Sequence, residues 1–167
     1  MMEKVRELVP KTDPILKEKI PKFDFSNPPI DPVELAHILT QTMLQKNGLG
    51  LSAPQIGLPY RAFVIRSNPI ICCFNPFIVD RTSDMVYLDE GCLTFPNLFV
   101  KIKRPSAIKI RYTEPNGNVV TNKYTGMTSR AIQHECDHLE GILFTTRANS
   151  YHLEQSRKKL KKYEKQF

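Results

Sequence analysis

Apolar residues recur at helical spacing shortly after residue 31. They form one stripe, which consists of Leu35, Ile38, Leu39 and Met43. Asp31 precedes the stripe as a cap, Pro32 stands in the first turn, where its missing N–H costs nothing, and Glu34 follows the cap by three residues. Gly48 can end this helix. His37 lies beside the stripe with no other metal-ligand type four residues away, so it is predicted to pack or to face solvent.

Between residues 61 and 124 the pattern changes to short runs of β-prone residues. The best candidates for strands are Arg61–Ile65, Phe99–Lys103, Ala107–Tyr112 and Val119–Tyr124. Polar and apolar residues alternate through the third run, which is typical of a half-buried antiparallel strand. The turn-forming sequence Glu-Pro-Asn-Gly-Asn separates the last two runs and predicts a hairpin. The sheet is therefore predicted to be mostly antiparallel.

Two further helices are predicted towards the carboxyl end. One begins near Thr128 or Ser129 and runs to about Leu139, where Gly141 stops it. The other starts after Ser150, with lysines on one side and apolar residues on the opposite side, at Leu153, Leu160, Tyr163 and Phe167. The segment 147–167 is thus predicted to be a basic amphipathic helix.

The length and composition set limits on the architecture. A chain of 167 residues is long enough for one hydrophobic core, so residues 1–167 are predicted to form a single domain. The longest apolar run, Ile70–Phe74, is too short to span a bilayer. Met1–Glu7 mixes charges of both signs and lacks the apolar block of a secretory signal, so we expect a cytoplasmic protein without membrane attachment.

The net charge of +7 is concentrated at one end. From Arg147 onward seven basic residues oppose two acidic ones, so this tail carries +5. Such a stretch could contact ribosomal RNA through its phosphates, or it could simply be a solvated helix face. The chain has four cysteines, Cys72, Cys73, Cys92 and Cys136, which are too few for a disulfide framework. They are better explained as reduced thiols, one of which binds a metal.

The segment His134–His138, with the sequence His-Glu-Cys-Asp-His, carries the clearest chemistry. Residues four apart lie on one face of a helix, so His134 and His138 can bind the same metal ion. Glu135 stands beside the metal without binding it, which suits a general base that takes a proton from a metal-bound water. The alternative is chance spacing on a helix that only packs.

A third protein ligand must come from elsewhere in the chain. A thermolysin-like protease would use a downstream glutamate, but Glu154 and Glu164 lie in the basic tail without a supporting motif. A metzincin would need a third histidine six residues after His138, where this chain has Phe144. Cys136 points to nearly the opposite side of the helix from His134 and is predicted to be a small buried residue.

Cys92 is the better third ligand. It stands in the segment Glu90–Pro96, where glycine and proline fix an unusual backbone path beside a strand. By itself this segment could equally be a bulge with a buried cysteine. A second unusual segment, Gly48–Gly57, is rich in glycine and small residues, so its backbone can approach a ligand closely, and it offers one amide side chain, Gln55. It lacks the Lys-Ser/Thr ending of a P-loop.

These segments together resemble the signatures of the peptide deformylases, in the same order. The three matching segments are Gly48–Gly57, Glu90–Pro96 and Gln133–Gly141, with further similarity at Asp13–Leu16 and Arg104-Pro105. The resemblance runs from about Lys11 to Phe144. It implies a small α+β fold, in which mostly antiparallel sheets pack around a central metal-binding helix, with one helix towards the amino end and another at the carboxyl end.

The resemblance also implies a chemistry. One divalent ion would be held by Cys92, His134 and His138 with one water. The activity would be removal of the formyl group from the N-terminal formylmethionine of newly made polypeptides, releasing formate. Metal hydroxide would attack the formyl carbon while Glu135 accepts the proton and returns it to the departing amine. Mixed sulfur and nitrogen ligands suit zinc or ferrous iron. The resemblance favours Fe²⁺, with Zn²⁺, Ni²⁺ or Co²⁺ as other occupants.

Further roles follow from the same resemblance. The Leu93 backbone N–H and the Gln55 amide would stabilise the negative oxygen of the tetrahedral intermediate. The backbone of Leu49 and Gly50 would align the peptide like an added strand. The methionine pocket would be surrounded by Leu88, Glu90, Gly91, Met127 and Ala131.

The chain departs from the family pattern at two positions. Ser52 replaces a usual alanine and Thr94 a usual serine, and we expect both to alter selectivity rather than abolish activity. Asp137 is expected to make an ion pair or a contact behind the metal ligands, and Arg104 to pair with Glu90 or Asp137.

A zinc endopeptidase and a basic RNA-binding module with a structural metal are the rival hypotheses. The protein is expected to act as a monomer on N-formylmethionyl peptides.

Overall fold

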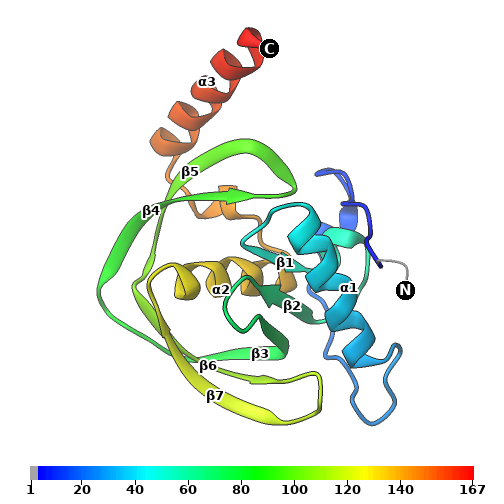
Figure 1. Cartoon of the computed structure of the whole chain (residues 1–167). Coiled ribbons are helices and arrows are strands. Elements are labelled where there is room, and N and C mark those ends of the chain that lie inside the picture. Colours follow the sequence, from blue (N-terminus) through cyan, green and yellow to red (C-terminus); the bar gives the residue numbers. More distant parts are fainter. Residues whose placement is uncertain (1–3) are drawn as a thin grey trace.

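The computed structural model describes residues 4–167, so Met1, Met2 and Glu3 of the amino-terminal segment considered above lie outside the described residues. The helices are α1 (Pro32–Gln45), α2 (Gly126–Leu139) and α3 (Ser150–Gln166), and short 3-10 turns occur at Pro14–Lys17, Ala53–Ile56 and Phe144–Arg147. Figure 1 shows α2 at the centre of the molecule, with strands around it and α1 to one side. The predicted α+β architecture around a central helix is confirmed.

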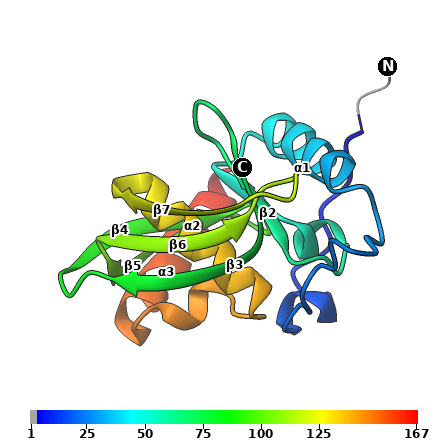
Figure 2. The same cartoon turned by 90° about the horizontal axis from the view of Figure 1, so that it is seen from below.

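All strand pairs are antiparallel, as predicted. A five-stranded sheet has the order β1-β2-β3-β6-β7, with β1 at Gly50–Ser52, β2 at Ala62–Ile65, β3 at Ile71–Arg81, β6 at Ala107–Thr113 and β7 at Val119–Thr125. Figure 2 shows β3, β6 and β7 running side by side as one layer. A separate two-stranded sheet joins β4 (Met85–Cys92) to β5 (Phe95–Pro105) through a tight turn. The turn residues of this second sheet include Leu93.

Apolar contacts hold α2 between the sheets and so fix the metal-binding motif. Ile132 and Leu139 of α2 are fully buried against residues of the larger sheet, among them Phe63 and Ile110. The α1 stripe packs in a second cluster against β2 and Phe74. A third cluster lies against β5 around Phe144 and includes Leu98, Val100 and Ile102. Burial of this much apolar surface makes the central helix a rigid support for side chains.

The predicted elements at both ends of the chain are largely confirmed. Asp31 accepts a hydrogen bond from the Val33 N–H, which caps α1 as expected. The helix ends at Gln45, earlier than predicted, and Asn47 takes the left-handed φ of 58°. His37 is exposed. α2 starts at Gly126, before the predicted Thr128 or Ser129, and Gly141 follows its end with φ 73°.

Helix α3 projects away from the rest of the molecule beyond β5 (Figure 1). Leu153 and Leu160 pack against the third cluster, as the amphipathic pattern predicts. Tyr163 and Phe167 do not reach it, because their side chains stay 46% and 89% exposed. The apolar face of α3 is therefore covered only along its first part. Among residues 4–167, no helix has the length and apolar character needed to cross a membrane.

Candidate metal centre and its cavity

The structure brings the three predicted metal ligands together. Cys92 is the last residue of β4, and His134 and His138 lie one turn apart on α2. Their ligand atoms all lie within 4.8 Å of one another, and the Cys92 Sγ is 3.4 Å from the His138 Nε2. Both histidines are buried, while Cys92 is half-buried. Cys136, by contrast, is partly buried against the cluster that contains Ile132 and Leu139, and it does not belong to this group.

Glu90 fixes the orientation of the His134 ring. Its Oε1 lies 3.0 Å from the His134 Nδ1, which places the proton on Nδ1 and leaves Nε2 free to bind a metal. Burial by itself would lower the pKa of His134. The hydrogen bonds with Cys92 and Glu90 outweigh this effect and raise the pKa to about 10. Burial holds the pKa of His138 well below its usual range.

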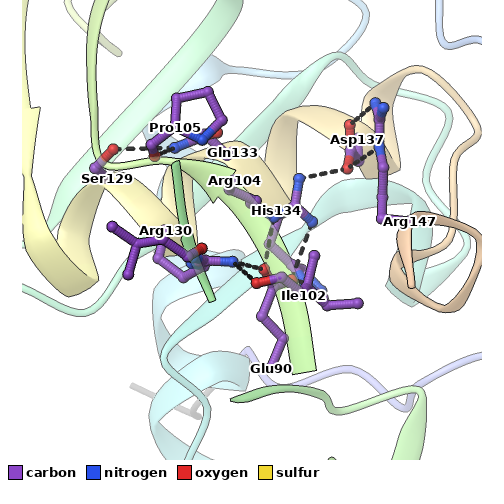
Figure 3. A network of polar contacts seen from close by, with 11 residues as sticks. Glu90, Ile102, Arg104, Pro105, Ser129, Arg130, Gln133, His134, Asp137 and Arg147 are labelled. Carbon is purple, nitrogen blue, oxygen red and sulfur yellow. Dashed lines mark hydrogen bonds and ion pairs between the residues drawn. The ribbon is translucent and has the colours of Figure 1, made fainter. Parts of the chain in front are cut away.

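A buried network of ion pairs surrounds Glu90 (Figure 3). The Arg104 guanidinium donates to both carboxylate oxygens of Glu90, at 2.6 and 3.0 Å, and to Asp137 at 2.8 Å. Arg130 donates to the Glu90 Oε2 at 2.8 Å, and Arg147 makes two contacts with Asp137. Burial opposes ionisation of Glu90, yet hydrogen bonds from His134 and Arg104 hold its pKa well below its usual range. The expected pairing of Asp137 is confirmed, and Arg104 pairs with both candidate carboxylates.

Glu135 has the opposite environment. Its side chain is buried, and its Oε2 has no hydrogen-bond partner in the described part of the chain. Burial raises its pKa to about 7, although the nearby His134 acts in the other direction. A Cβ on Gly50 would lie only 2.8 Å from the Glu135 Oε1, so position 50 accepts glycine alone without displacing this carboxyl group.

The side chain of Gln55 lies beside the metal ligands in a fixed orientation. Its Oε1 accepts hydrogen bonds from the backbone N–H and the hydroxyl of Ser52, both at 2.9 Å. Its Nε2 therefore faces the other way, 3.5 Å from the Cys92 Sγ and 3.1 Å from the Thr94 Oγ1. The two departures from the family pattern thus both contact Gln55.

These groups open onto a cavity of about 270 Å³. Its lining includes most of the residues named from the sequence, namely Leu49, Gly50, Gln55, Glu90, Gly91, Cys92, Leu93, Met127, Ala131, His134 and Glu135. Leu88 and His138 are not among the lining residues. Arg130 does line the cavity, and no sequence motif singled it out. Its spacing was the available signal, because Arg130 stands four residues before His134 and so lies on the same face of the metal-binding helix.

The donor set fits one divalent ion. A thiol and two imidazoles converge, and one ring is held by a carboxylate behind it. The Glu135 carboxyl group lies alongside, and its Oε2 has no hydrogen-bond partner within the described residues. Fold and site together define the class: a small α+β protein with a single Cys-His-His metal site beside a buried glutamate.

Comparisons with known proteins give the family. The family model for polypeptide deformylase matches residues 5–154. The peptide deformylase of Microchaete diplosiphon is 38% identical over 123 residues, which cover 70% of this chain and 66% of that protein. The peptide deformylase of Desulforudis audaxviator is 38% identical over 149 residues, covering 87% of this chain and 95% of that protein.

A solved structure agrees with these sequence matches. The class I type b peptide deformylase of Acinetobacter baumannii, bound to Met-Ala-Ser, superposes with a TM-score of 0.81 at 30% identity, covering 87% of this chain and 99% of that one. The chain belongs to the peptide deformylase family, which is a family of hydrolases.

Proposed function

We propose that the protein removes the N-formyl group from N-formylmethionyl peptides and releases formate. The observation that carries this proposal is the convergence of the Cys92, His134 and His138 ligand atoms within 4.8 Å, at a cavity that Glu135 also lines. The presence of Met-Ala-Ser in the related Acinetobacter baumannii structure supports a peptide beginning with methionine as the product.

The chemistry divides between the metal and the protein. A divalent ion held by the Cys-His-His group would supply a bound water of lowered pKa and would polarise the formyl carbonyl. Glu135 accepts the proton of the attacking water and returns it to the amine that leaves. Its carboxyl group suits this exchange because a pKa of about 7 lies close to a neutral working pH.

Two donors stabilise the negative charge that develops on the formyl oxygen. They are the Leu93 backbone N–H, in the turn between β4 and β5, and the Gln55 Nε2. Ser52 and Thr94 hold the Gln55 amide from both ends, so its donor is in place before the substrate binds. Removing one donor of this kind typically slows an enzyme by about a hundredfold or more.

The peptide lies along β1. Strand β1 is an edge strand of the larger sheet and pairs only with β2 among the described strands, so its other edge is available for an added strand. Leu49 and Gly50 supply this backbone edge. The first side chain of the peptide points into the part of the cavity lined by Gly91, Met127 and Ala131.

Ferrous iron is the proposed native ion, and zinc, nickel or cobalt can replace it. A thiolate with two imidazoles accommodates each of these ions. Metal analysis of protein purified without oxygen, beside the formate assay on each reconstituted form, tests this choice. Equal iron-free and iron-loaded activity would contradict it.

The central test is release of formate from formyl-Met-Ala-Ser. The Glu135→Gln variant should keep its metal and lose about a hundredfold or more of its turnover. Glu140→Gln is the matched control, because Glu140 pairs with Arg61 and Lys19 and does not line the cavity. Internal cleavage of casein would instead support an endopeptidase, and a metal site without hydrolysis would support a binding module. Full activity of Glu135→Gln would refute the proton-transfer role.

The basic tail is proposed to contact the ribosome. Arg157, Lys158, Lys159, Lys161 and Lys162 are all exposed on α3, which projects from the molecule (Figure 1). The family model ends at residue 154, so these five basic residues lie beyond the matched segment. Cosedimentation with ribosomes across a salt series, with and without residues 157–167, tests the contact. Binding that is unchanged by the deletion and insensitive to salt would refute it.

A single copy of the chain suffices for the proposed reaction, because one chain supplies every site residue.

A further inference from the structure

Arg130 is an unusual residue to find in the wall of this cavity. Its side chain is only 5% exposed, and it lies one turn before His134 on α2. The guanidinium donates to the Glu90 Oε2 at 2.8 Å and to two backbone carbonyls of the smaller sheet, Ile102 at 2.8 Å and Val86 at 2.6 Å. Figure 3 shows it directed at Glu90 from the α2 side. A cation is thus built into the wall rather than placed at its rim.

The position of Arg130 places it where the first side chain of the substrate would lie. Met127, Arg130 and Ala131 are spaced by three and four residues on α2, so they share one helix face with His134. All of them line the same cavity as the Cys92 thiol and Glu135. A peptide whose formyl group reacts beside Glu135 therefore extends its first side chain along α2, over Ala131 and Arg130.

Arg130 already has a carboxylate partner in the cavity wall. It pairs with Glu90, which also lines the cavity, whereas Arg104, Asp137 and Arg147 of the same network do not. An acidic substrate side chain would approach Glu90 as well as Arg130, so the pocket gains little from a carboxylate. A neutral hydrogen-bond acceptor meets no such repulsion. A guanidinium has five N–H donors, and Arg130 uses three of them in hydrogen bonds with Glu90, Ile102 and Val86.

We propose that Arg130 is a specificity-determining residue that donates a hydrogen bond to an acceptor atom near the end of the first substrate side chain. The class of substrate it favours is an N-formyl peptide whose first side chain carries such an acceptor. The sulfur of methionine is a weak acceptor, the oxygen of methionine sulfoxide is a strong one, and the isosteric hydrocarbon norleucine has none. This inference rests on the proposed deformylase function and deepens it.

The competing explanation is that Arg130 only ties α2 to the smaller sheet. A purely structural residue would change the rates for all substrates by one common factor. We therefore compare kcat/KM for formyl-Met-Ala-Ser and its norleucine and methionine sulfoxide analogues, in the natural protein and in Arg130→Met. A hydrogen bond to a charged donor corresponds to about tenfold or more in rate. The ratio of sulfoxide to norleucine should fall by about that factor in Arg130→Met.

Arg61→Met is the matched control. Arg61 holds the opposite end of α2 through the Leu139 and Ile20 carbonyls and Glu140, and it does not line the cavity. Its removal should leave the substrate ratios unchanged, whatever it does to stability. An equal sulfoxide to norleucine ratio in the natural protein and in Arg130→Met would overturn the proposal.

The test remains decisive if Arg130→Met does not fold. The natural protein alone must then turn over the sulfoxide peptide at least as well as the norleucine peptide, and Arg130→Lys, which keeps the charge, must retain that preference in part. Preference for norleucine over the sulfoxide in the natural protein overturns the proposal. Failure of the proposed function is distinguishable, because no formate would then be released from any of the three peptides.

Discussion

Glu90→Gln is the substitution that best tests the buried network behind the metal ligands. The Glu90 Oε1 lies beside the His134 Nδ1 and one Arg104 nitrogen, and the Oε2 lies beside a second Arg104 nitrogen and Arg130. All four neighbours are donors in the metal-binding state. Whichever way the glutamine amide turns, its NH₂ group meets two of these donors. The variant therefore loses both the charge and the hydrogen-bond match.

The substitution should weaken both metal binding and folding stability. Loss of the group that orients a metal-binding histidine typically weakens metal binding by about 10–100-fold. Breaking a buried ion pair by removing one partner typically costs about 3–5 kcal/mol of folding stability. The shift in the pKa of Glu90 gives the pH dependence. Because the pKa of Glu90 is lowered in the folded protein, ionised Glu90 contributes to folding stability at pH values above the ordinary carboxyl pKa. This stability is lost as the pH falls from the ordinary carboxyl pKa towards the lowered pKa of the folded protein.

Chelator competition measures the first quantity, and urea unfolding of the metal-free protein measures the second. Glu140→Gln is the control, since Glu140 is 36% exposed in its pair with Arg61 and should cost at most about 1 kcal/mol. Metal affinity in this control should not change. Unchanged metal affinity in Glu90→Gln, at pH 7, would show that the contact with His134 does not support the site.

Three further predictions concern the groups around the cavity. Gly50→Ala should lower turnover by about tenfold or more while metal content is retained, because its Cβ would lie 2.8 Å from the Glu135 Oε1; formate release beside metal analysis checks this. Ser52→Ala removes one of two hydrogen bonds to the Gln55 Oε1, so kcat should fall by roughly two- to tenfold, and a variant with full kcat would contradict the positioning role. Brief alkylation at pH 8, followed by mass spectrometry, should show Cys92 modified before Cys72 in the metal-free protein, and added zinc should protect Cys92. Cys72 reacts slowly because burial raises the pKa of its thiol to about 12, so at pH 8 only roughly one molecule in ten thousand carries the Cys72 thiolate.

Local signals in the sequence predicted the elements that rest on local chemistry. The Asp31 cap, the amphipathic α1 and the hairpin at residues 114–118 depend on neighbours within a few positions, and the structure confirms all of them. The strands that were missed are β1, β3 and β4. Strand β3 contains Asn75 and Pro76, where Asn75 has φ 49° and the register shifts, so its sequence resembles a break rather than a strand.

The site residues likewise fall into those that local motifs predict and those that only the folded chain brings together. The metal ligands were predicted because a motif gives both histidines in one segment and a second motif gives Cys92. The network around Glu90 was predicted only in outline, because its partners come from far along the chain: Arg104 is 14 residues away and Arg130 is 40. Leu88 was expected in the methionine pocket but is not among the lining residues, whereas Arg130 lines the cavity although no motif pointed to it. Only the packing of α2 against the smaller sheet reveals these two positions.

The two glutamates of the site show how the fold assigns different tasks to one residue type. Glu90 is surrounded by guanidinium groups and an imidazole N–H, so it stays ionised and can hold a ring in place. Glu135 is as deeply buried, but one of its carboxyl oxygens has no hydrogen-bond partner among residues 4–167, and its pKa rises to about 7. The negative charge of Glu90 itself contributes to that rise. Two carboxyl groups with pKa values driven apart can serve as a permanent anchor and as an exchangeable proton carrier. In the proposed reaction, the arginines that neutralise Glu90 therefore do more than stabilise the fold, because they keep Glu90 from competing for the proton assigned to Glu135.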